Sequence, residues 1–478
     1  MKRFRVLIPT ALVSVSLLAA GHDLTPAVTA NQTRPVVTGN GSGFMAVWIE
    51  PVPQSRNSVV SQAVSGSGEP IFGAGAAIDQ PPVWSMAIAH SPSDSLAVWI
   101  AEGNVYAERL SPSGMPLSTI LLTPAKSFPA DVAVEWNGSR YFVIWSDGVQ
   151  LAGAFVAPDG SSTTPRPFFT EPSNASRDAA VPDIAWNGQH FVVVFGERPN
   201  NPCNILCPIP NPDKFRVMRV SAAGDAIDTS PLVITGNHYR AHVASSGAES
   251  LIALDSPGGV STIIAHDQSG LTLDAESPLF PWVTEVASAV VWDGAKYMVG
   301  WRYVGADASW IGAASVTPSG LPFDYRFTVA SILPFGLTLW SGRPSIAVND
   351  AGLAALAFSD AAAPPSSLLR ARLYLAPELG PMPQPPSAPR NVVSFFAGNT
   401  ARIDWQSDGG AGGFAVESWS DYYNSWNLYR TVPGDARTTT VSAALGSLFR
   451  IRAFGPGGVS EGAVTSIGSM QRRRAAPR

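Results

Sequence analysis

The sequence predicts an all-β fold: a seven-bladed β-propeller with four-stranded antiparallel blades, followed by a small β-sandwich. The main observation is a ten-residue phrase that recurs at 136–145, 186–195 and 292–301 and begins Trp-Asn-Gly or Trp-Asp-Gly each time. Recurrence of this kind indicates one supersecondary unit stacked many times. No window keeps a 3.6-residue apolar period over the length of a helix, and this excludes a helical solenoid.

Each repeat is predicted to hold four short strands within about 50 residues. The Asn-Gly or Asp-Gly pair follows the first strand, because such pairs tolerate the positive φ angles of a tight hairpin. A second turn places Pro before Gly, as in 111–114, 157–160 and 317–320. Four antiparallel strands at this period are typical of a propeller blade. The second strands of seven units end at Trp48, Trp99, Trp145, Phe195, Leu254, Trp301 and Phe358.

The propeller is expected to cover residues 22–378, with its ring closed by the start of the mature chain. The last unit, 343–375, contains three strands and then runs into Pro-rich sequence. Residues 22–30 are similar to the fourth-strand segment at 117–124. We therefore expect the N-terminal strand to complete the last blade, which would remove an exposed sheet edge.

Residues 1–21 are predicted to be a signal peptide. Lys2, Arg3 and Arg5 precede a short apolar stretch, and Ala19-Ala20-Gly21 supplies small residues for cleavage. No later segment reaches the roughly 18 uncharged apolar residues of a membrane span. The formal net charge of -5 is too mild to indicate a nucleic acid or an anionic membrane as partner. The protein is expected to be secreted to the extracellular medium or the periplasm.

The two cysteines, Cys203 and Cys207, stand close together in a Pro-rich loop. In an oxidising compartment this predicts a disulfide that staples the loop. A metal site would need further Cys or His ligands, and none lies nearby in the sequence. The sequence also lacks an Asp-x-Asp-x-Asp-Gly calcium loop and a Gly-rich phosphate loop before a helix. We therefore predict neither a metal nor a cofactor.

A second domain is predicted after a stiff Pro-rich linker at 379–388. Short alternating strands at 389–468 indicate a β-sandwich, and 469–478 is a basic tail expected to be disordered. Trp405 and the stretch 449–460 resemble a fibronectin type III domain. One departure is Ser447, which stands where that family usually has its corner tyrosine.

The propeller segment is similar to the secreted bacterial β-propellers that carry a Trp-Asn-Gly-x-x-Tyr-x-Val-x-Trp phrase, often ahead of fibronectin-like modules. This resemblance implies export and binding and does not imply a particular reaction.

Three groups of aromatic residues bear on where a ligand could bind. Trp136, Trp186 and Trp292 keep a fixed place in the repeat and are predicted to pack between blades. Four others break the pattern and are expected on an exposed surface: Trp84, Trp282, Trp310 and Trp340. An aromatic cluster in the small domain is interpreted either as a sugar platform or as core and rim: Trp419, Tyr422, Tyr423 and Trp426.

A ligand site is predicted on the face where the loops between second and third strands vary most in length. The connections that enter the first strands should lie on the same face. Arg34, Asp131, Arg240 and Arg343 stand about six residues before the first hairpin turns and so form a charged ring near the channel. Our hypothesis is a cationic site for a carboxylate-bearing or otherwise anionic group. The alternative is a set of solvated arginines at strand starts.

The leading functional interpretation is a secreted, non-enzymatic recognition protein for an extracellular glycan or protein. The first alternative is a polysaccharide-degrading glycosidase or lyase, which needs two carboxylates ~5 to ~9 Å apart. The carboxylates nominated for it are Asp131, Asp183, Asp255 and Glu285. The second alternative is a structural component of the cell surface or matrix.

Two further chemistries are disfavoured by the sequence. Ser460 lies in a Gly-x-Ser-x-Gly match, but the match falls in a β-sandwich loop rather than on a strand-to-helix elbow. His238 and His242 would be about 13 Å apart on one strand face, too far for one metal ion, and are predicted to be ordinary polar positions.

Overall fold

The computed structural model is all-β over the residues that it describes. These are 21–25, 31–52, 56–71, 75–80, 82–123, 129–147, 150–170, 177–199, 212, 214–282, 286–304, 309–331, 344–361, 369–421 and 425–467. The helix within them is the 3₁₀ turn η2 (Ala376–Glu378). Across the described ranges, no helix has the length and apolarity that a membrane crossing requires.

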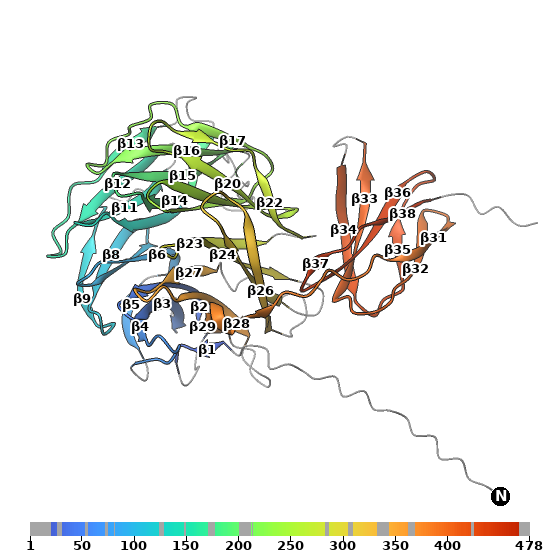
Figure 1. The fold of residues 1–478 in the computed structure, drawn as a ribbon, viewed down its shortest axis with the longest axis horizontal. Coiled ribbons are helices and arrows are strands. Elements are labelled where there is room, and N and C mark those ends of the chain that lie inside the picture. The colour runs from blue at the N-terminus through green and yellow to red at the C-terminus, as the bar shows by residue number, and fades with distance from the viewer. Residues whose placement is uncertain are drawn as a thin grey trace, which may run out of the picture.

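Seven antiparallel sheets, numbered 1 to 7 here, contain the strands that the structure describes in the first 381 residues (Figure 1). Sheet 1 contains β2 (Thr33–Asn40), β3 (Gly43–Val52), β4 (Arg56–Val64) and β5 (Ala76–Gln80). Sheet 2 contains β6 (Val83–His90), β7 (Ser95–Ala101), β8 (Asn104–Leu110) and β9 (Pro116–Leu121). Sheet 3 contains β10 (Val132–Trp136), β11 (Tyr141–Asp147), β12 (Gln150–Val156) and β13 (Arg166–Thr170).

Sheet 4 contains β14 (Arg177–Trp186), β15 (His190–Pro199), β16 (Lys214–Ser221) and β17 (Leu232–Thr235). Sheet 5 contains β18 (Arg240–Ser245), β19 (Glu249–Ser256), β20 (Gly259–His266), β21 (Thr272–Leu273) and β22 (Ser277–Pro281). Sheet 6 contains β23 (Ala287–Trp292), β24 (Tyr297–Val304), β25 (Ser309–Val316), β26 (Pro322–Ser331) and β30 (Gly380–Pro381). Sheet 7 contains β27 (Ser345–Val348), β28 (Ala354–Ala361), β29 (Leu369–Leu375) and β1 (His22–Asp23).

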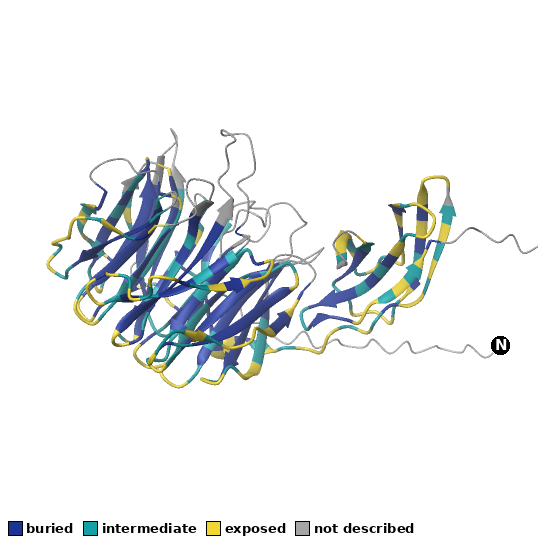
Figure 2. Cartoon of the chain, turned by 90° about the horizontal axis from the view of Figure 1, so that it is seen from above, coloured by how far each residue is buried: buried dark blue, intermediate teal, exposed yellow. Residues whose placement is uncertain are grey.

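The repeated phrase forms the first hairpin of a sheet for a local reason. Gly138, Gly188 and Gly294 adopt φ values of 91°, 94° and 95°. The Asn137 side chain accepts hydrogen bonds from the backbone N–H of Ser139 and Arg140 and fixes the turn. The second strand lies between the first and third strands of its own sheet, and its two faces pack against the neighbouring sheets, so it is buried on both faces, as β11 is over its first six residues. The burial view follows the same pattern, with dark strands and exposed turns (Figure 2).

The seven sheets form a closed ring around an axis (Figure 1). The first strand of each sheet contacts the first strand of the next, and β27 of sheet 7 contacts β2 of sheet 1. His22 and Asp23 pair with Leu373 and Arg372 in antiparallel register, which is the closing strand that the sequence predicts. Leu24, fully buried, anchors the same segment in the core between sheets 7 and 1.

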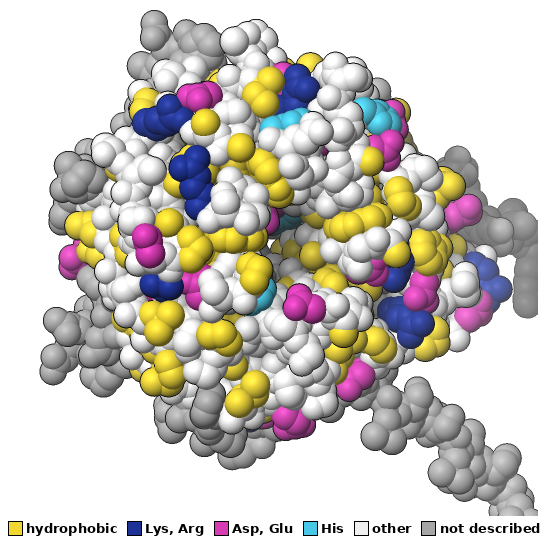
Figure 3. Space-filling view, turned by 60° about the vertical axis from the view of Figure 1, so that its left-hand side comes forward, with side chains coloured by type: hydrophobic (Ala, Val, Ile, Leu, Met, Phe, Trp, Pro, Cys, Tyr) yellow, Lys and Arg dark blue, Asp and Glu magenta, His cyan; other side chains and the backbone are white. Residues whose placement is uncertain are grey.

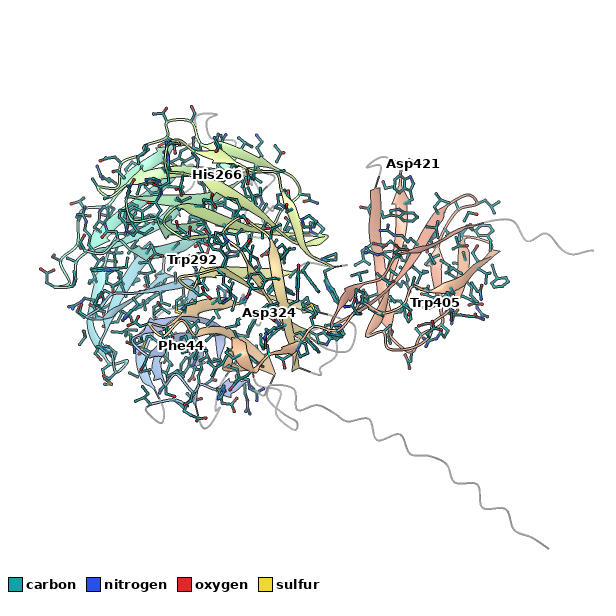
Figure 4. All side chains as sticks on the ribbon, viewed as in Figure 1. Phe44, His266, Trp292, Asp324, Trp405 and Asp421 are labelled. Carbon is teal, nitrogen blue, oxygen red and sulfur yellow. The ribbon has the colours of Figure 1, made fainter. Side chains whose placement is uncertain are left out.

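Residues 390–466 form two smaller sheets that pack on each other. One contains β31 (Arg390–Ala397), β32 (Thr400–Gln406) and β35 (Thr438–Ser442). The other contains β33 (Gly413–Ser420), β34 (Ser425–Pro433), β36 (Leu448–Gly455), β37 (Gly458–Val459) and β38 (Ala463–Ser466). Trp405 is buried between them, with its ring 5.2 Å from that of Phe414 (Figure 4).

The first residues of the Pro-rich linker predicted at 379–388 pair with sheet 6 of the ring and do not form a free spacer. Gly380 and Pro381 pair with Phe327 and Arg326 of β26, and the Met382 N–H donates to the Tyr325 carbonyl. The linker expected from the sequence is therefore held against sheet 6 at its N-terminal end.

The prediction that Trp282 and Trp310 are exposed is wrong. Both are buried, with exposed fractions of 2% and 5%. Trp282 lies 5.3 Å, ring to ring, from Phe454 of the smaller domain, and the Tyr303 hydroxyl donates to the Pro456 carbonyl at 2.6 Å. Their break in the repeat pattern therefore marks an apolar contact between the two domains. The other two predicted surface tryptophans, Trp340 and the side chain of Trp84, lie outside the described residues.

Several further predictions also fall outside the described residues. These are residues 1–20 of the predicted signal peptide (1–21), the basic tail from 469, Cys203 and Cys207 with their disulfide, Glu285, Arg343, Tyr422 and Tyr423.

Candidate ligand site in the central channel

A channel of about 1320 Å³ runs along the axis of the ring. Residues from the first strands of all seven sheets line it, together with Pro212 and Arg302. Figure 3 shows a hollow near the middle of one face, bordered mainly by hydrophobic and uncharged side chains with a histidine close to it. Large ligand pockets reach about 1,000 Å³, so the channel has room for more than one small ring.

The channel has two chemically different ends. The entry mouth, defined here by Arg34, Asp131 and Arg240, lies where the chain enters the first strands. The turn mouth, defined by His90, Trp186, Trp292 and Asp350, lies where the first strands end at their hairpin turns. In Figure 4 Trp292 lies towards the middle of the ring.

Arg34 reaches the entry mouth through an irregular backbone. It has a φ of 53° and lies in a β-bulge between Thr33 and Val36, directly before Pro35. Val181, before Pro182, repeats this arrangement in β14 with a φ of 45°. A bulge redirects side chains, and positive φ in a non-glycine residue is strained, so both features are typical of functional sites.

The Arg34 side chain is exposed, and it makes no hydrogen bond or ion pair with any residue that the structure describes. The channel walls around the guanidinium still remove part of its solvation and lower its pKa; Asp131 opposes this shift and Arg240 adds to it. An arginine remains charged under these conditions because its ordinary pKa is so high. The entry mouth thus presents an unpaired cation.

Arg240 and Asp131 form an ion pair between sheets 5 and 3, with Nη1 3.3 Å from Oδ2. The other carboxylate oxygen of Asp131 accepts a hydrogen bond from the Ser85 hydroxyl of sheet 2 at 2.6 Å. Three sheets are therefore linked by polar contacts at this mouth.

Deeper in the channel wall, His242 lies between two carboxylates. Its Nδ1 is 3.4 Å from Asp183 Oδ2 and its Nε2 is 3.9 Å from Asp255 Oδ2. Burial alone would lower the pKa of His242, but Asp183 and Asp255 outweigh it and raise the pKa above its ordinary value. Burial raises the pKa of Asp255, although His242 and Ser288 partly oppose this.

Glu135 is a further titratable group in the channel wall, close enough to Asp183 to feel its charge. Desolvation raises its pKa to about 8, and the negative charge of Asp183 adds to the shift. At neutral pH its carboxyl group is therefore mainly protonated and can donate a hydrogen bond.

Three of the four predicted ligand residues meet at one mouth: Arg34, Asp131 and Arg240. The fourth, Arg343, lies outside the described residues. Among the nominated carboxylates, Asp183 lines the channel, whereas Asp255 does not and is 2% exposed. Asp255 is thus not a channel carboxylate, because its hydrogen bonds to Ser288 hold it within the sheets.

Sequence reasoning did not consider Glu135, and it interpreted His242 as an ordinary polar position, whereas His242 lies in the channel wall between Asp183 and Asp255. For Glu135, strand alternation contained the signal, because residues 133 and 135 share one face of β10 and continue the alternation that starts at Asp131, just before the strand. His238, in contrast, is buried beside Phe215 and Glu276. Over the described ranges, no three His, Cys, Asp or Glu side chains are placed to hold a metal ion.

Comparison with protein-family models gives no match, and no curated protein matches the sequence. Similar solved structures include the β-propeller domain of the Trilobed protease from Pyrococcus furiosus, at 12% identity and a TM-score of 0.40, covering 72% of this chain and 95% of that one. The SapL1 lectin in complex with alpha methyl fucoside has 11% identity and a TM-score of 0.39, covering 65% and 98%. The Dos1 propeller has 10% identity and a TM-score of 0.38, covering 72% and 78%.

These likenesses are too distant to carry an argument about this chain. The assignment to the β-propellers follows from the sheets themselves: consecutive antiparallel strands in each, first strands in mutual contact, and an N-terminal strand in the last sheet.

Proposed function

We propose that this protein is an exported, non-enzymatic binding protein. In this proposal it is a seven-bladed β-propeller joined to a fibronectin type III-like domain, and its channel holds the anionic group of an extracellular ligand. The signal-like N-terminus and the resemblance of the repeats support export. The residues of the entry mouth support the binding role.

One observation carries the proposal: the charged Arg34 side chain lies in the channel without a partner among the described residues. The charge of Arg240 acts on Arg34 at the same mouth, and Arg240 is paired with Asp131 at 3.3 Å. A carboxylate entering this mouth would find a guanidinium with its planar set of donors unoccupied, an arrangement that suits carboxylate recognition.

The strained conformation of Arg34 adds a second line of support. A left-handed backbone costs about 1–2 kcal/mol for a residue other than glycine. Arginine at this position is therefore kept at the expense of stability, which agrees with a role for the side chain in binding.

The test is an array of acidic and neutral glycans together with extracellular proteins, probed with the full mature chain. We expect binding to carboxylate-bearing ligands that falls at least tenfold in Arg34→Ala and in Arg240→Ala. Arg166→Ala is the matched control, because Arg166 lies on an outer strand and pairs with the exposed Asp225. Equal binding by all three variants would exclude the entry mouth as the site.

A hydrolytic role is the second candidate, and Glu135 is the observation that favours it. A protonated carboxyl next to a second carboxylate, Asp183, is the pattern of an acid and its partner base. Release of new reducing ends from an acidic polysaccharide, abolished by Glu135→Gln and by Asp183→Asn, would support hydrolysis. Binding without any release supports the non-enzymatic role.

A further inference from the structure

The turn mouth of the channel combines aromatic and polar side chains. Trp186 ends β14 and Trp292 ends β23, and both are half-buried and line the channel. His90 of β6 and Asp350, just after β27, line the same end. The His90 Nδ1 is 3.2 Å from the Ser95 hydroxyl. Apolar rings that alternate with hydrogen-bonding groups match a sugar, which has apolar C–H faces and polar hydroxyl edges.

Trp186 and Trp292 do more than pack between sheets. Both contact the core by one side: Trp186 lies 4.7 Å from Phe191 and Trp292 lies 4.8 Å from Tyr297, measured between ring centroids. Trp136 holds the equivalent place in sheet 3 and packs on Tyr141 at 4.8 Å, but it does not line the channel. All three tryptophans share the same packing contact, which explains their structural role. That contact does not explain why Trp186 and Trp292 also line the channel.

The distance between the two mouths sets the minimum length of a ligand that contacts both. From Asp131 at the entry mouth to the level of Trp136 there are five residues of extended strand, which span about 16 Å. A guest that touches both Arg34 and the two indoles must therefore be longer than one sugar ring. The channel volume of about 1320 Å³ admits such a guest.

We propose that the ligand of the channel is a short acidic oligosaccharide, seated along the axis with its carboxylate at Arg34 and a sugar ring against Trp186 and Trp292. This inference rests on the proposed binding function and names its ligand class. Glu135, the residue before Trp136 at the turn end of β10, has a raised pKa and can donate a hydrogen bond to a sugar hydroxyl without repelling the carboxylate.

The experiment measures affinity by calorimetry with uronic-acid oligosaccharides of one to four rings and with their neutral counterparts. We expect the acidic trimer to bind at least tenfold tighter than both the acidic monosaccharide and the neutral trimer. Trp186→Ala and Trp292→Ala should each weaken trimer binding about tenfold. Trp136→Ala is the matched control and should change it less than twofold, since it loses the same packing without facing the channel.

Trp186→Phe and Trp292→Phe keep the experiment decisive where an alanine variant folds poorly, because a smaller ring should still retain part of the affinity. The outcomes separate the two proposals. The oligosaccharide inference alone is overturned if acidic ligands bind through Arg34 but their affinity does not rise with a second and third sugar ring. It is also overturned if Trp136→Ala, Trp186→Ala and Trp292→Ala weaken binding equally. Binding of an extracellular protein through Arg34 with no binding of any acidic sugar also overturns the oligosaccharide inference alone. Ligand binding that is indifferent to Arg34→Ala, or no binding of any acidic sugar or extracellular protein, overturns both proposals.

Discussion

The Arg240 guanidinium lies 3.3 Å from the Asp131 carboxylate although 109 positions separate the two residues in the chain. They belong to sheets 5 and 3, and sheet 4 stands between them in the ring. The contact exists because the first strands converge on the axis, where residues at equal depth in different sheets come within reach of one another.

Removing the charge of Asp131 should strengthen the binding of an anionic ligand. Asp131→Asn frees Arg240 and makes the entry mouth more cationic, so we expect affinity to rise about fivefold, equal to about 1 kcal/mol. Calorimetry at low and high salt measures this, and the gain should shrink at high salt because ions screen the charge. Asp225→Asn, in an exposed outer turn, is the control and should have no effect. Weaker binding by Asp131→Asn would mean that Asp131 itself contacts the ligand.

Replacing Arg34 with glycine should separate stability from binding. Glycine accepts the φ of 53° without strain, so Arg34→Gly is expected to raise the free energy of unfolding by roughly 1 kcal/mol. Arg34→Ala keeps the strained backbone and should bring no such gain. Both variants should lose affinity for the anionic ligand. Urea unfolding and calorimetry on the same samples check the two effects, and a destabilised glycine variant would contradict the strain argument.

Glu135 should make the protein less stable as the pH rises. Its pKa in the folded state is about 8, above the ordinary value of 4.5, so the folded state holds this proton more tightly than the unfolded state does. Its contribution to stability is full below about pH 4.5 and is lost as the pH rises to about 8. Glu135→Gln should therefore gain roughly 1–3 kcal/mol over the natural protein between pH 5 and pH 8. Urea unfolding at the two pH values measures the difference, and parallel pH profiles would refute the shift.

The contact between the domains should make them unfold together. Trp282→Ala removes a ring buried against Tyr303, Trp310 and Phe454, and we expect a loss of about 3–5 kcal/mol. Calorimetric melting should show one main transition for the natural protein and two for the variant. Trp419→Ala, in a half-exposed ring of the smaller domain, serves as control. Two transitions already present in the natural protein would show that the interface does not couple the domains.

The closing strand should be needed for stability of the ring. Asp23 forms ion pairs with Arg370 and Arg372, the second at 2.7 Å, and Leu24 is buried beside it. A chain that starts at residue 31 should melt several degrees lower than one that starts at residue 22, because sheet 7 is left with an open edge. Asp23→Ala should have a smaller effect of the same sign. Equal melting temperatures for the two chain starts would contradict the closure.

The local pattern allowed much of the fold to be predicted. Asn137 and Gly138 define a hairpin by their own hydrogen bonds and φ preference, and the same phrase must give the same turn wherever it recurs. The surface position predicted for Trp282 and Trp310 was wrong because their burial depends on residues far away in the chain. Nothing local distinguishes an exposed Trp282 from one buried against Phe454, a residue more than a hundred and fifty positions away.

In the candidate site, too, some features follow from local sequence and others only from the tertiary structure. By itself the sequence determined that Arg34, Asp131 and Arg240 stand at equivalent places in their repeats, since position within a repeat is a local property. Only the tertiary structure decided that Arg240 pairs with Asp131, that His242 lies between Asp183 and Asp255, and that desolvation raises the pKa of Glu135. Those outcomes depend on distance and desolvation around a common axis, and these arise only when separate sheets are brought together.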